Sequence, residues 1–255
     1  MSERPAVQVT NLGFAYRLMR SPVSTVSELA ITALHRQISY ELLWALRGVS
    51  FEVGRGETLV VIGRNGAGKS TLVKALARIL PPREGRVVVR GHISPIIELG
   101  AGFSAELTGA ENAVLYGALL GHDPGWLRSH TDAIAAYAGV ENFMDVPLRA
   151  YSSGMLGRLA FAIATLGTPD VLLIDEVLAV GDEEFRQRSA ARIDELIARG
   201  TAVVLVTHGL EFARQRADRV LWLDHGSQLM LGEAGEVIDA YLADAVQGRL
   251  EGVGA

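Results

Sequence analysis

The sequence predicts an α/β fold with a parallel sheet at its core, an antiparallel β layer beside it and an inserted helical subdomain. Short runs of Val, Ile and Leu recur along the chain, and patterns of helical spacing separate them. Runs that are apolar almost throughout suit strands buried on both faces, as in a parallel sheet with helices on each side. The runs with this character are residues 58–62, 171–174, 202–206 and 220–223.

The other elements follow from changes in this pattern along the chain. Residues 45–56 and 86–97 alternate between apolar and polar side chains, which predicts the antiparallel layer. A helix is predicted over 68–80, and Pro81-Pro82 should end it because proline lacks the amide hydrogen that a helix needs. Residues 105–168 are rich in Ala, poor in strand-like runs and broken by Gly and Pro, which predicts the helical subdomain.

These elements predict a single domain over residues 1–255. Its core and β layer should comprise residues 1–104 and 169–235, on either side of the helical subdomain in sequence. The remaining residues, 236–255, are enough for one short C-terminal helix. Its apolar face is predicted to consist of Val237, Ile238, Tyr241 and Leu242.

Composition and charge exclude several classes of protein. The net charge of −5 argues against a nucleic-acid partner, because phosphate backbones attract a surplus of Lys and Arg. The absence of cysteine excludes disulfides and thiolate metal sites. The N-terminus lacks the apolar core of a signal peptide, and no run reaches the ~18 apolar residues of a membrane span. The sequence therefore predicts a soluble, cytoplasmic chain.

Residues 17–43 contain a second helical pattern near the N-terminus. Thr25 and Glu28 have the spacing of a capping box, and apolar residues follow at helical intervals. Two interpretations remain open, a helix packed on its own domain and a docking or gating element for a partner.

The clearest motif is a glycine-rich loop that matches G-x-x-x-x-G-K-[ST] in full. It follows the apolar run 58–62 and begins a predicted helix, where backbone N–H groups and the helix N-terminus favour phosphate. Lys69 is expected to reach the β- and γ-phosphates of ATP, and the Ser70 hydroxyl to ligate Mg²⁺. The motif comprises Gly63, Arg64, Asn65, Gly66, Ala67, Gly68, Lys69 and Ser70, and Thr71 follows it.

Acidic and histidine side chains follow two other predicted strands. Asp175 and Glu176 end the run that begins at Val171. Asp175 is expected to hold Mg²⁺ through water, and Glu176 to act as the general base for the attacking water. His208 follows the run 202–206, and strand ends in such sheets open onto a shared crevice, where it would donate to the γ-phosphate.

Residues 151–155, Tyr-Ser-Ser-Gly-Met, precede a helical stretch and lie about 20 residues before the acidic strand end. With the P-loop, they make the chain similar to the ABC-type ATPases over nearly its whole length. That family's signature is usually Leu-Ser-Gly-Gly-Gln; Ser152 and Gly154 keep it, whereas Ser153 and the two flanking residues differ. The resemblance implies that Ser152, Ser153 and Gly154 contact the nucleotide.

The resemblance also implies roles for residues elsewhere in the chain. Asp182, seven residues after Asp175, matches the D-loop aspartate, and His208 matches the switch histidine. Arg158 matches the Arg after the signature, and Glu98 is the nearest substitute for the Q-loop glutamine near Mg²⁺. An aromatic residue near the N-terminus stacks on adenine in this family. Tyr16 is the expected one, because it follows the strand-like residues 7–10, and Trp44 is the competitor.

Three stretches together resemble one subfamily, the ATPases that drive export of O-antigen, capsular polysaccharide or teichoic acid. They are residues 98–112, 151–155 and 176–182. The resemblance implies an ATP-sandwich homodimer bound to an integral membrane permease dimer, at the cytoplasmic face of the bacterial inner membrane. Residues 105–168 would dock on the permease. Because no carbohydrate-binding domain fits after residue 235, the permease would handle most of the polysaccharide.

Two alternative functions remain open at this point. The first is an ABC exporter ATPase for another cargo, such as a lipid or a drug. The second is a soluble ABC-type ATPase that acts in DNA repair, translation or cluster assembly.

Overall fold

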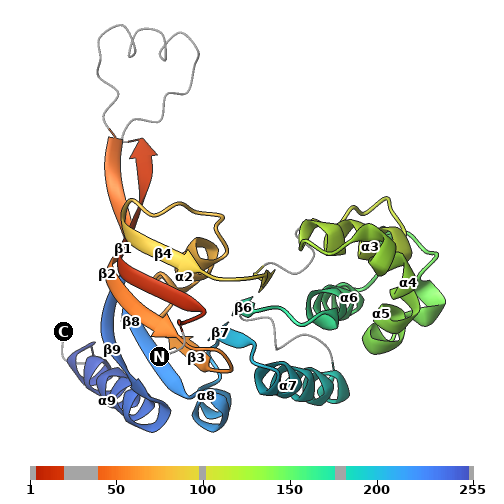
Figure 1. Ribbon diagram of the computed structural model, residues 1–255. Coiled ribbons are helices and arrows are strands. Elements are labelled where there is room, and N and C mark those ends of the chain that lie inside the picture. Colours follow the sequence, from red (N-terminus) through yellow and green to blue (C-terminus); the bar gives the residue numbers. More distant parts are fainter. Residues whose placement is uncertain (1–3, 20–39, 98–101, 176–181, 253–255) are drawn as a thin grey trace, which may run out of the picture.

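The computed structural model describes residues 4–19, 40–97, 102–175 and 182–252, which form two sheets and a set of helices (Figure 1). The larger sheet has six strands, and all neighbouring pairs are parallel except the last, β8 and β9. The α/β fold class is therefore confirmed. The strands in spatial order are β5 (Ile93–Ile96), β6 (Val171–Asp175), β7 (Ala202–Val206), β3 (Thr58–Ile62), β8 (Arg219–Asp224) and β9 (Ser227–Glu233).

Alternate residues of the central strands face two separate cores. In β3, Val60 and Ile62 pack in one core with the helices, while Leu59 and Val61 pack in the other. Every residue of β3 is buried, because both faces of the sheet are covered. This explains why the strand appears in the sequence as an uninterrupted apolar run.

The smaller sheet is antiparallel and has the order β2, β1, β4. Its strands are β1 (Val7–Met19), β2 (Tyr40–Val53) and β4 (Glu84–Val89). The predicted antiparallel layer was wrong in its last part, since β5 (Ile93–Ile96) pairs in parallel with β6 in the larger sheet. The chain changes sheets at Gly91, which has φ 90°, and the Asp170 carboxylate accepts a hydrogen bond from the next backbone N–H at 2.8 Å.

The helix that follows the glycine-rich loop, α2 (Lys69–Leu76), ends four residues before the predicted boundary. Arg78 adopts the left-handed conformation, with φ 62°. The N–H groups of Ile79 and Arg78 bond to the carbonyls of Lys74 (3.0 Å) and Ala75 (3.1 Å). This is a Schellman cap, so the helix stops at its own C-terminal hydrogen bonds and not at the prolines.

The segment between residues 109 and 166 is helical and lies to one side of both sheets (Figure 1). Further helices pack on the face of the larger sheet opposite α2. The helices are α3 (Gly109–Leu119), α4 (Pro124–Ser129), α5 (Thr131–Ala138), η1 (Glu141–Phe143), η2 (Leu148–Ala150), α6 (Ser153–Leu166), α7 (Glu183–Ala198), α8 (Leu210–Arg216) and α9 (Ala234–Gly252). Within the described ranges, none of these helices has the length and apolarity of a membrane span.

The C-terminal helix α9 packs through part of the predicted apolar face. Val237 and Ile238 are buried, and Tyr241 meets the Trp222 ring edge-on at 5.5 Å. Leu242 was wrongly assigned to this face, since it is 44% exposed.

The N-terminal region includes residues 17–43, which the sequence singled out. Residues 17–19 and 40–43 extend β1 and β2 as a paired ribbon that projects from the body (Figure 1). The predicted capping box at Thr25 and Glu28, with the helix after it, lies outside the described residues.

Candidate functional site

The glycine-rich loop joins β3 to α2 in a conformation that only glycine permits. Gly63 has φ 150°, and a Cβ atom there would lie 2.1 Å from the Leu223 carbonyl oxygen. Gly68 has φ 99°, and its Cβ would lie 2.4 Å from the Ala45 carbonyl oxygen. The loop is thus pressed between β2 and β8, which accounts physically for Gly63 and Gly68.

Lys69 lies within the curve of this loop. Its side chain is buried, and Nζ donates to the carbonyls of Gly63 (2.8 Å) and Arg64 (3.1 Å). The first turn of α2 contains no acidic residue, so the helix N-terminus and the ammonium group together favour an anion.

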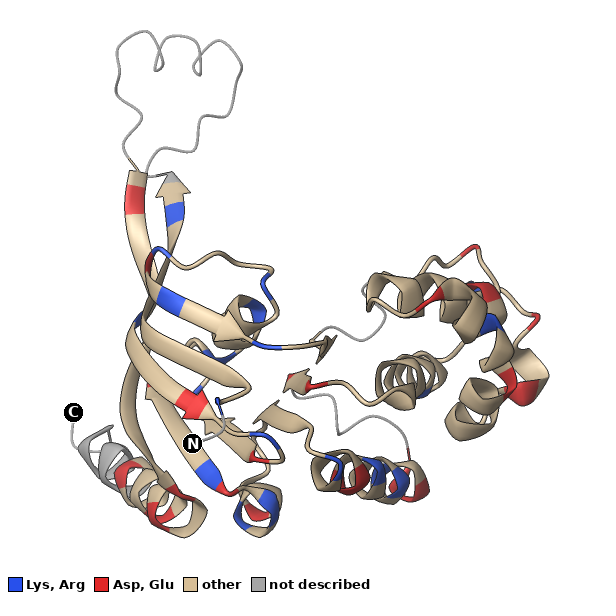
Figure 2. Cartoon of the chain, viewed as in Figure 1, with Lys and Arg blue, Asp and Glu red and all other residues tan. Residues whose placement is uncertain are grey.

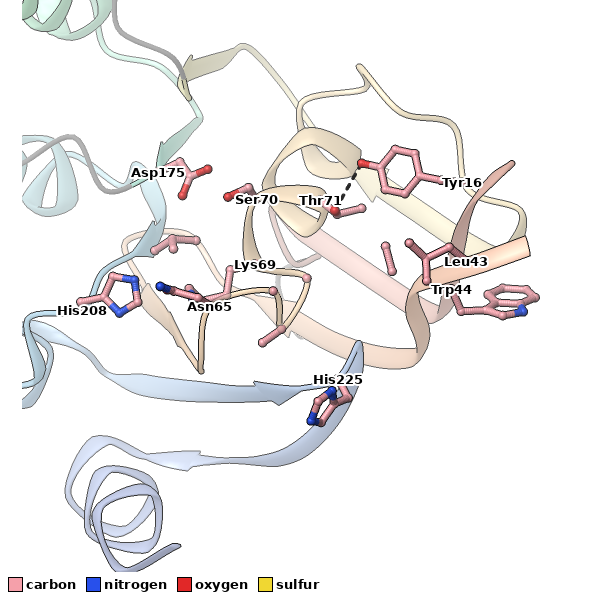
Figure 3. A pocket seen from close by; sticks show the side chains of 15 residues that line it. Tyr16, Leu43, Trp44, Asn65, Lys69, Ser70, Thr71, Asp175, His208 and His225 are labelled. Carbon is pink, nitrogen blue, oxygen red and sulfur yellow. Dashed lines mark hydrogen bonds between the residues drawn. The ribbon is translucent and has the colours of Figure 1, made fainter. Parts of the chain in front are cut away.

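The loop lines a cleft of about 570 Å³ (Figure 3). The structure brings together most of the residues that the sequence singles out for nucleotide or metal binding. Those that line the cleft are Tyr16, Trp44, Asn65, Gly66, Gly68, Lys69, Ser70, Thr71, Asp175 and His208. Leu43, Ala45, Ala67, Val206 and His225 also line it.

Of these further lining residues, Ala67 lies within the glycine-rich motif and Val206 within a predicted strand, whereas Leu43, Ala45 and His225 belong to no motif and were missed. Leu43 and Ala45 reach the cleft through the pairing of β2 with β1. His225 lies in the turn between β8 and β9, where Gly226 donates to the Ala67 carbonyl of the loop at 3.1 Å. Tertiary contacts alone place Leu43, Ala45 and His225 at the cleft, so no local sequence signal identifies them.

Two oxygen-bearing side chains face each other at the cleft. Ser70 begins α2 and Asp175 ends β6, and their oxygens point toward one another (Figure 3). Such hard oxygen donors suit Mg²⁺, which binds through few protein ligands together with water and phosphate. Within the described ranges, no cluster of three or more His, Cys, Asp or Glu side chains competes for a metal. The residues present therefore fit Mg²⁺.

The two aromatic candidates differ in how they face the cleft. The Tyr16 hydroxyl lies 3.5 Å from Thr71 Oγ1, whereas the Trp44 indole points away from the loop (Figure 3). The Arg47 guanidinium covers the Trp44 ring at 5.1 Å from its centroid. Tyr16 does not follow the first strand, as the sequence suggested, but lies inside it, because β1 continues to Met19 through several register shifts.

The signature residues lie at the N-terminus of α6, and none of them lines the cleft. Ser152 is the N-cap, and its Oγ accepts a hydrogen bond from Met155 N at 3.2 Å. Ser152 and Ser153 are exposed, and a Cβ at Gly154 would meet only Ser152 Oγ, at 3.8 Å. Within one chain, the signature and the glycine-rich loop are therefore apart.

Tyr151, the first residue of the signature segment, is fixed by its own contacts. Its ring is buried, and its hydroxyl donates to the Phe143 carbonyl at 2.7 Å. Burial, and secondarily the Asp145 carboxylate, raise the pKa of Tyr151, so the phenol remains a donor at neutral pH. Tyr151, which stands where the usual signature has leucine, thus anchors the turn that precedes α6.

Asp182 begins α7 as its N-cap, with Oδ1 accepting from Phe185 N at 2.9 Å. Its other oxygen lies 3.8 Å from Arg158 Nη1 on α6. Glu98 and Glu176 lie outside the described residues, so their predicted roles remain predictions.

A phosphate-binding loop at the end of a parallel strand, facing an acidic strand end, defines a P-loop nucleotide-binding protein. The ABC transporter family model matches residues 46–179. The chain therefore belongs to the ABC transporter family.

Curated relatives agree with this assignment. The O-antigen export system ATP-binding protein RfbB of Klebsiella pneumoniae is 35% identical over 242 residues, covering 93% of this chain and 97% of the relative. RfbB of Myxococcus xanthus is 42% identical over 200 residues, covering 78% of this chain. The teichoic acids export ATP-binding protein TagH of Listeria innocua is 40% identical over 198 residues. The matches span 46% of the Myxococcus protein and 59% of the Listeria protein. The predicted resemblance to polysaccharide-export ATPases is confirmed.

Solved structures support the fold. An ATP-binding subunit of an ABC transporter superposes with a TM-score of 0.74 at 22% identity, covering 92% of this chain and 93% of that one. A dimeric ATP-binding cassette in a post-hydrolysis state, bound to ADP and Pi, gives a TM-score of 0.72 at 21% identity. It covers 89% of this chain and 98% of its own.

Proposed function

We propose that this chain is the ATP-hydrolysing subunit of an ABC exporter that moves a lipid-linked cell-surface polysaccharide across the inner membrane. The observation that carries the proposal is the cleft that joins the glycine-rich loop to Asp175 and His208, in a chain whose match covers 97% of the length of Klebsiella RfbB. The subunit would lie at the cytoplasmic face of the membrane, held there by a permease.

The chain's own residues bind the triphosphate of ATP. Lys69 is already oriented by the loop carbonyls, and exchanging these partners for phosphate oxygens requires little movement. Ser70 and Asp175 would hold Mg²⁺, which neutralises charge on the phosphates when bound. His208 lines the same cleft from the end of β7 and would donate to the γ-phosphate. Glu176, the residue after Asp175, would take the proton of the attacking water.

Tyr16 is the residue that we propose to stack on adenine. Tyr16→Ala is expected to raise the half-saturating ATP concentration about tenfold, because base stacking on an aromatic ring contributes about 1–3 kcal/mol. Tyr16→Phe keeps the ring and should change the half-saturating ATP concentration little. Trp44→Ala should also change this concentration little. Steady-state hydrolysis at varied ATP concentrations measures all three variants. A larger effect at Trp44 than at Tyr16 would contradict this assignment.

ATP would be enclosed by two copies of the chain. The N-terminus of α6, with the exposed Ser152 and with Gly154, lies away from its own cleft. In a second copy these groups would meet the γ-phosphate held at Lys69. The dimeric cassette structures among the fold relatives support this arrangement.

An apolar groove of about 490 Å³ offers a docking site for the permease. We call it the α2–α3 groove. It is lined by Tyr16, Lys74, Ile79, Leu80, Pro95, Ile97, Tyr116, Leu119 and Leu120. Ile79 is 58% exposed and Leu119 65% exposed, so the groove keeps large apolar side chains in water. An amphipathic helix from a cytoplasmic loop of the permease would cover them.

The proposal is tested by deleting the gene in its own organism. Surface polysaccharide should disappear and lipid-linked glycan should accumulate inside the cell, and the wild-type chain should restore export. The chain should also copurify with a multispan membrane protein. Normal surface glycan with impaired lipid or drug efflux would indicate another cargo. A chain that purifies with no membrane protein would indicate the soluble class of ABC ATPases.

A further inference from the structure

Arginine side chains cap the C-termini of two helices, α5 and α6. Arg192, on α7, reaches the end of α6, where its Nε and Nη2 donate to the Thr165 carbonyl at 3.1 and 2.6 Å. Nη2 also lies 3.3 Å from the Leu166 carbonyl and 3.4 Å from that of Gly167. The last carbonyls of a helix lack partners within the helix and carry its negative dipole end. One guanidinium thus satisfies the end of α6.

The Arg192 side chain is held in this position from its other side. Nη1 donates to Glu195 Oε2 at 2.8 Å on the same helix, and the side chain is only 18% exposed. A lysine at this position would provide a point charge, whereas the planar fork of arginine reaches several carbonyls together. The geometry therefore depends on the guanidinium group as well as on its charge.

One turn earlier on α7, Arg188 makes a similar contact with α5. Its Nη1 donates to the Tyr137 carbonyl at 3.0 Å, and the Tyr137 hydroxyl donates back to the Arg188 carbonyl at 3.2 Å. Burial is the main cause that raises the pKa of Tyr137, so its hydroxyl remains a donor at neutral pH. On α6, Arg158 donates to the Ala138 carbonyl at 2.9 Å. The ends of α5 and α6 are thus tied to α7, and the end of α5 is also tied to the first half of α6.

The opposite ends of these helices carry the groups proposed to meet the second nucleotide. Ser152 caps the start of α6, and Asp182 caps the start of α7. Between these caps and the Arg192 contacts, the rings of Phe161 and Phe185 pack edge-on at 5.8 Å. An α-helix moves as a rod, so a change in the tilt of α6 at its Arg192 end displaces Ser152 at its other end.

We propose that Arg192 is a positioning residue for the composite nucleotide site. It holds α6 against α7, so that the signature and Asp182 approach the ATP of a second chain as one preset surface. This inference rests on the two-chain arrangement proposed above. Figure 2 shows many charges of both signs along α7, and Arg192 is distinguished among them by its contacts with the end of α6.

The test compares Arg192→Ala with Arg216→Ala, both in a Glu176→Gln background that retains ATP. Arg216 is a matched control, because from α8 it pairs with Asp194 and contacts the Ala190 carbonyl, both on α7. Its guanidinium also covers the Phe212 ring on its own helix, and none of these contacts involves α6. Light scattering measures ATP-driven dimerisation. A fluorescent ATP analogue measures nucleotide binding by the single chain, and thermal denaturation measures folding.

We expect Arg192→Ala to weaken ATP-driven dimerisation about tenfold and to leave analogue binding by the single chain within about twofold. Arg192→Lys should fall between this variant and the parent. Arg216→Ala should change dimerisation by less than about twofold, whatever its melting temperature. In the chain with Glu176 intact, Arg192→Ala should lower the maximal rate of ATP hydrolysis in proportion to its loss of dimer.

Equal dimerisation of the Arg192→Ala and parent chains would overturn the inference while leaving the two-chain site standing. Equal losses in the Arg192 and Arg216 variants would overturn it too, because they would indicate general destabilisation of α7. A Glu176→Gln parent that fails to dimerise with ATP would overturn the two-chain arrangement, and the inference with it.

Discussion

Replacing Glu176 by glutamine is expected to lower steady ATP hydrolysis by about 10²–10⁴-fold, the usual contribution of a general base. Glutamine is nearly the same size but has no basic oxygen, so the attacking water keeps its proton. ATP binding should persist, because the groups that contact the phosphates are unchanged. The variant should therefore trap a dimer with ATP enclosed.

Phosphate release and bound nucleotide measure this prediction in the purified chain. Glu183→Gln serves as the control, because Glu183 is an exposed acid in the first turn of α7 and pairs with Arg186 on that helix. It should hydrolyse ATP at nearly the wild-type rate. Substantial turnover by Glu176→Gln would show that another group takes the proton, and His208, which lines the cleft, would be the next candidate.

Replacing Leu119 by aspartate is expected to abolish export while leaving ATP hydrolysis by the isolated chain within about twofold. Leu119 is 65% exposed at the end of α3 and lines the α2–α3 groove, so the substitution does not disturb a packed core. A carboxylate there would have to lose its water when an apolar permease helix docks. Binding to the permease should therefore fail.

Copurification with the permease and surface glycan measure this second prediction. Leu229→Asp is the matched control, since Leu229 is also an exposed leucine, 53% accessible, but lies on the edge strand β9. It should export normally. Normal export by Leu119→Asp would place the permease elsewhere on the chain, and equal failure of both variants would indicate general loss of folding.

Local sequence was sufficient wherever one segment forms a feature by itself. The P-loop was predicted because its pattern lies within eight adjacent residues. Its glycines stand where the backbone takes positive φ angles, as at Gly63 and Gly68. The central strands were predicted because burial on both faces leaves an uninterrupted apolar run. By contrast, β5 was assigned to the wrong sheet, because pattern alone does not say which neighbour a strand will choose.

The nucleotide cleft combines both kinds of information. The residues of the glycine-rich loop and Asp175 were predicted from motifs to bind the nucleotide and its metal, and they line one cleft. His225 and Leu43 enter this cleft only through the pairing of β8 with β9 and of β2 with β1. The preference for Tyr16 over Trp44 also depends on orientation, which neither side chain reveals in the sequence. Long-range pairing sets these positions, and it leaves no local trace.

The amino-acid sequence by itself predicted the class of chemistry of this protein, because P-loop, acidic strand end and signature are short motifs that can be recognised from a few adjacent residues. Only the tertiary structure showed that the signature at Ser152 lies outside its own cleft, and that Arg192 connects α7 to the end of α6. These relations join residues far apart in the chain. They arise from how helices and sheets pack, and not from local conformational preference.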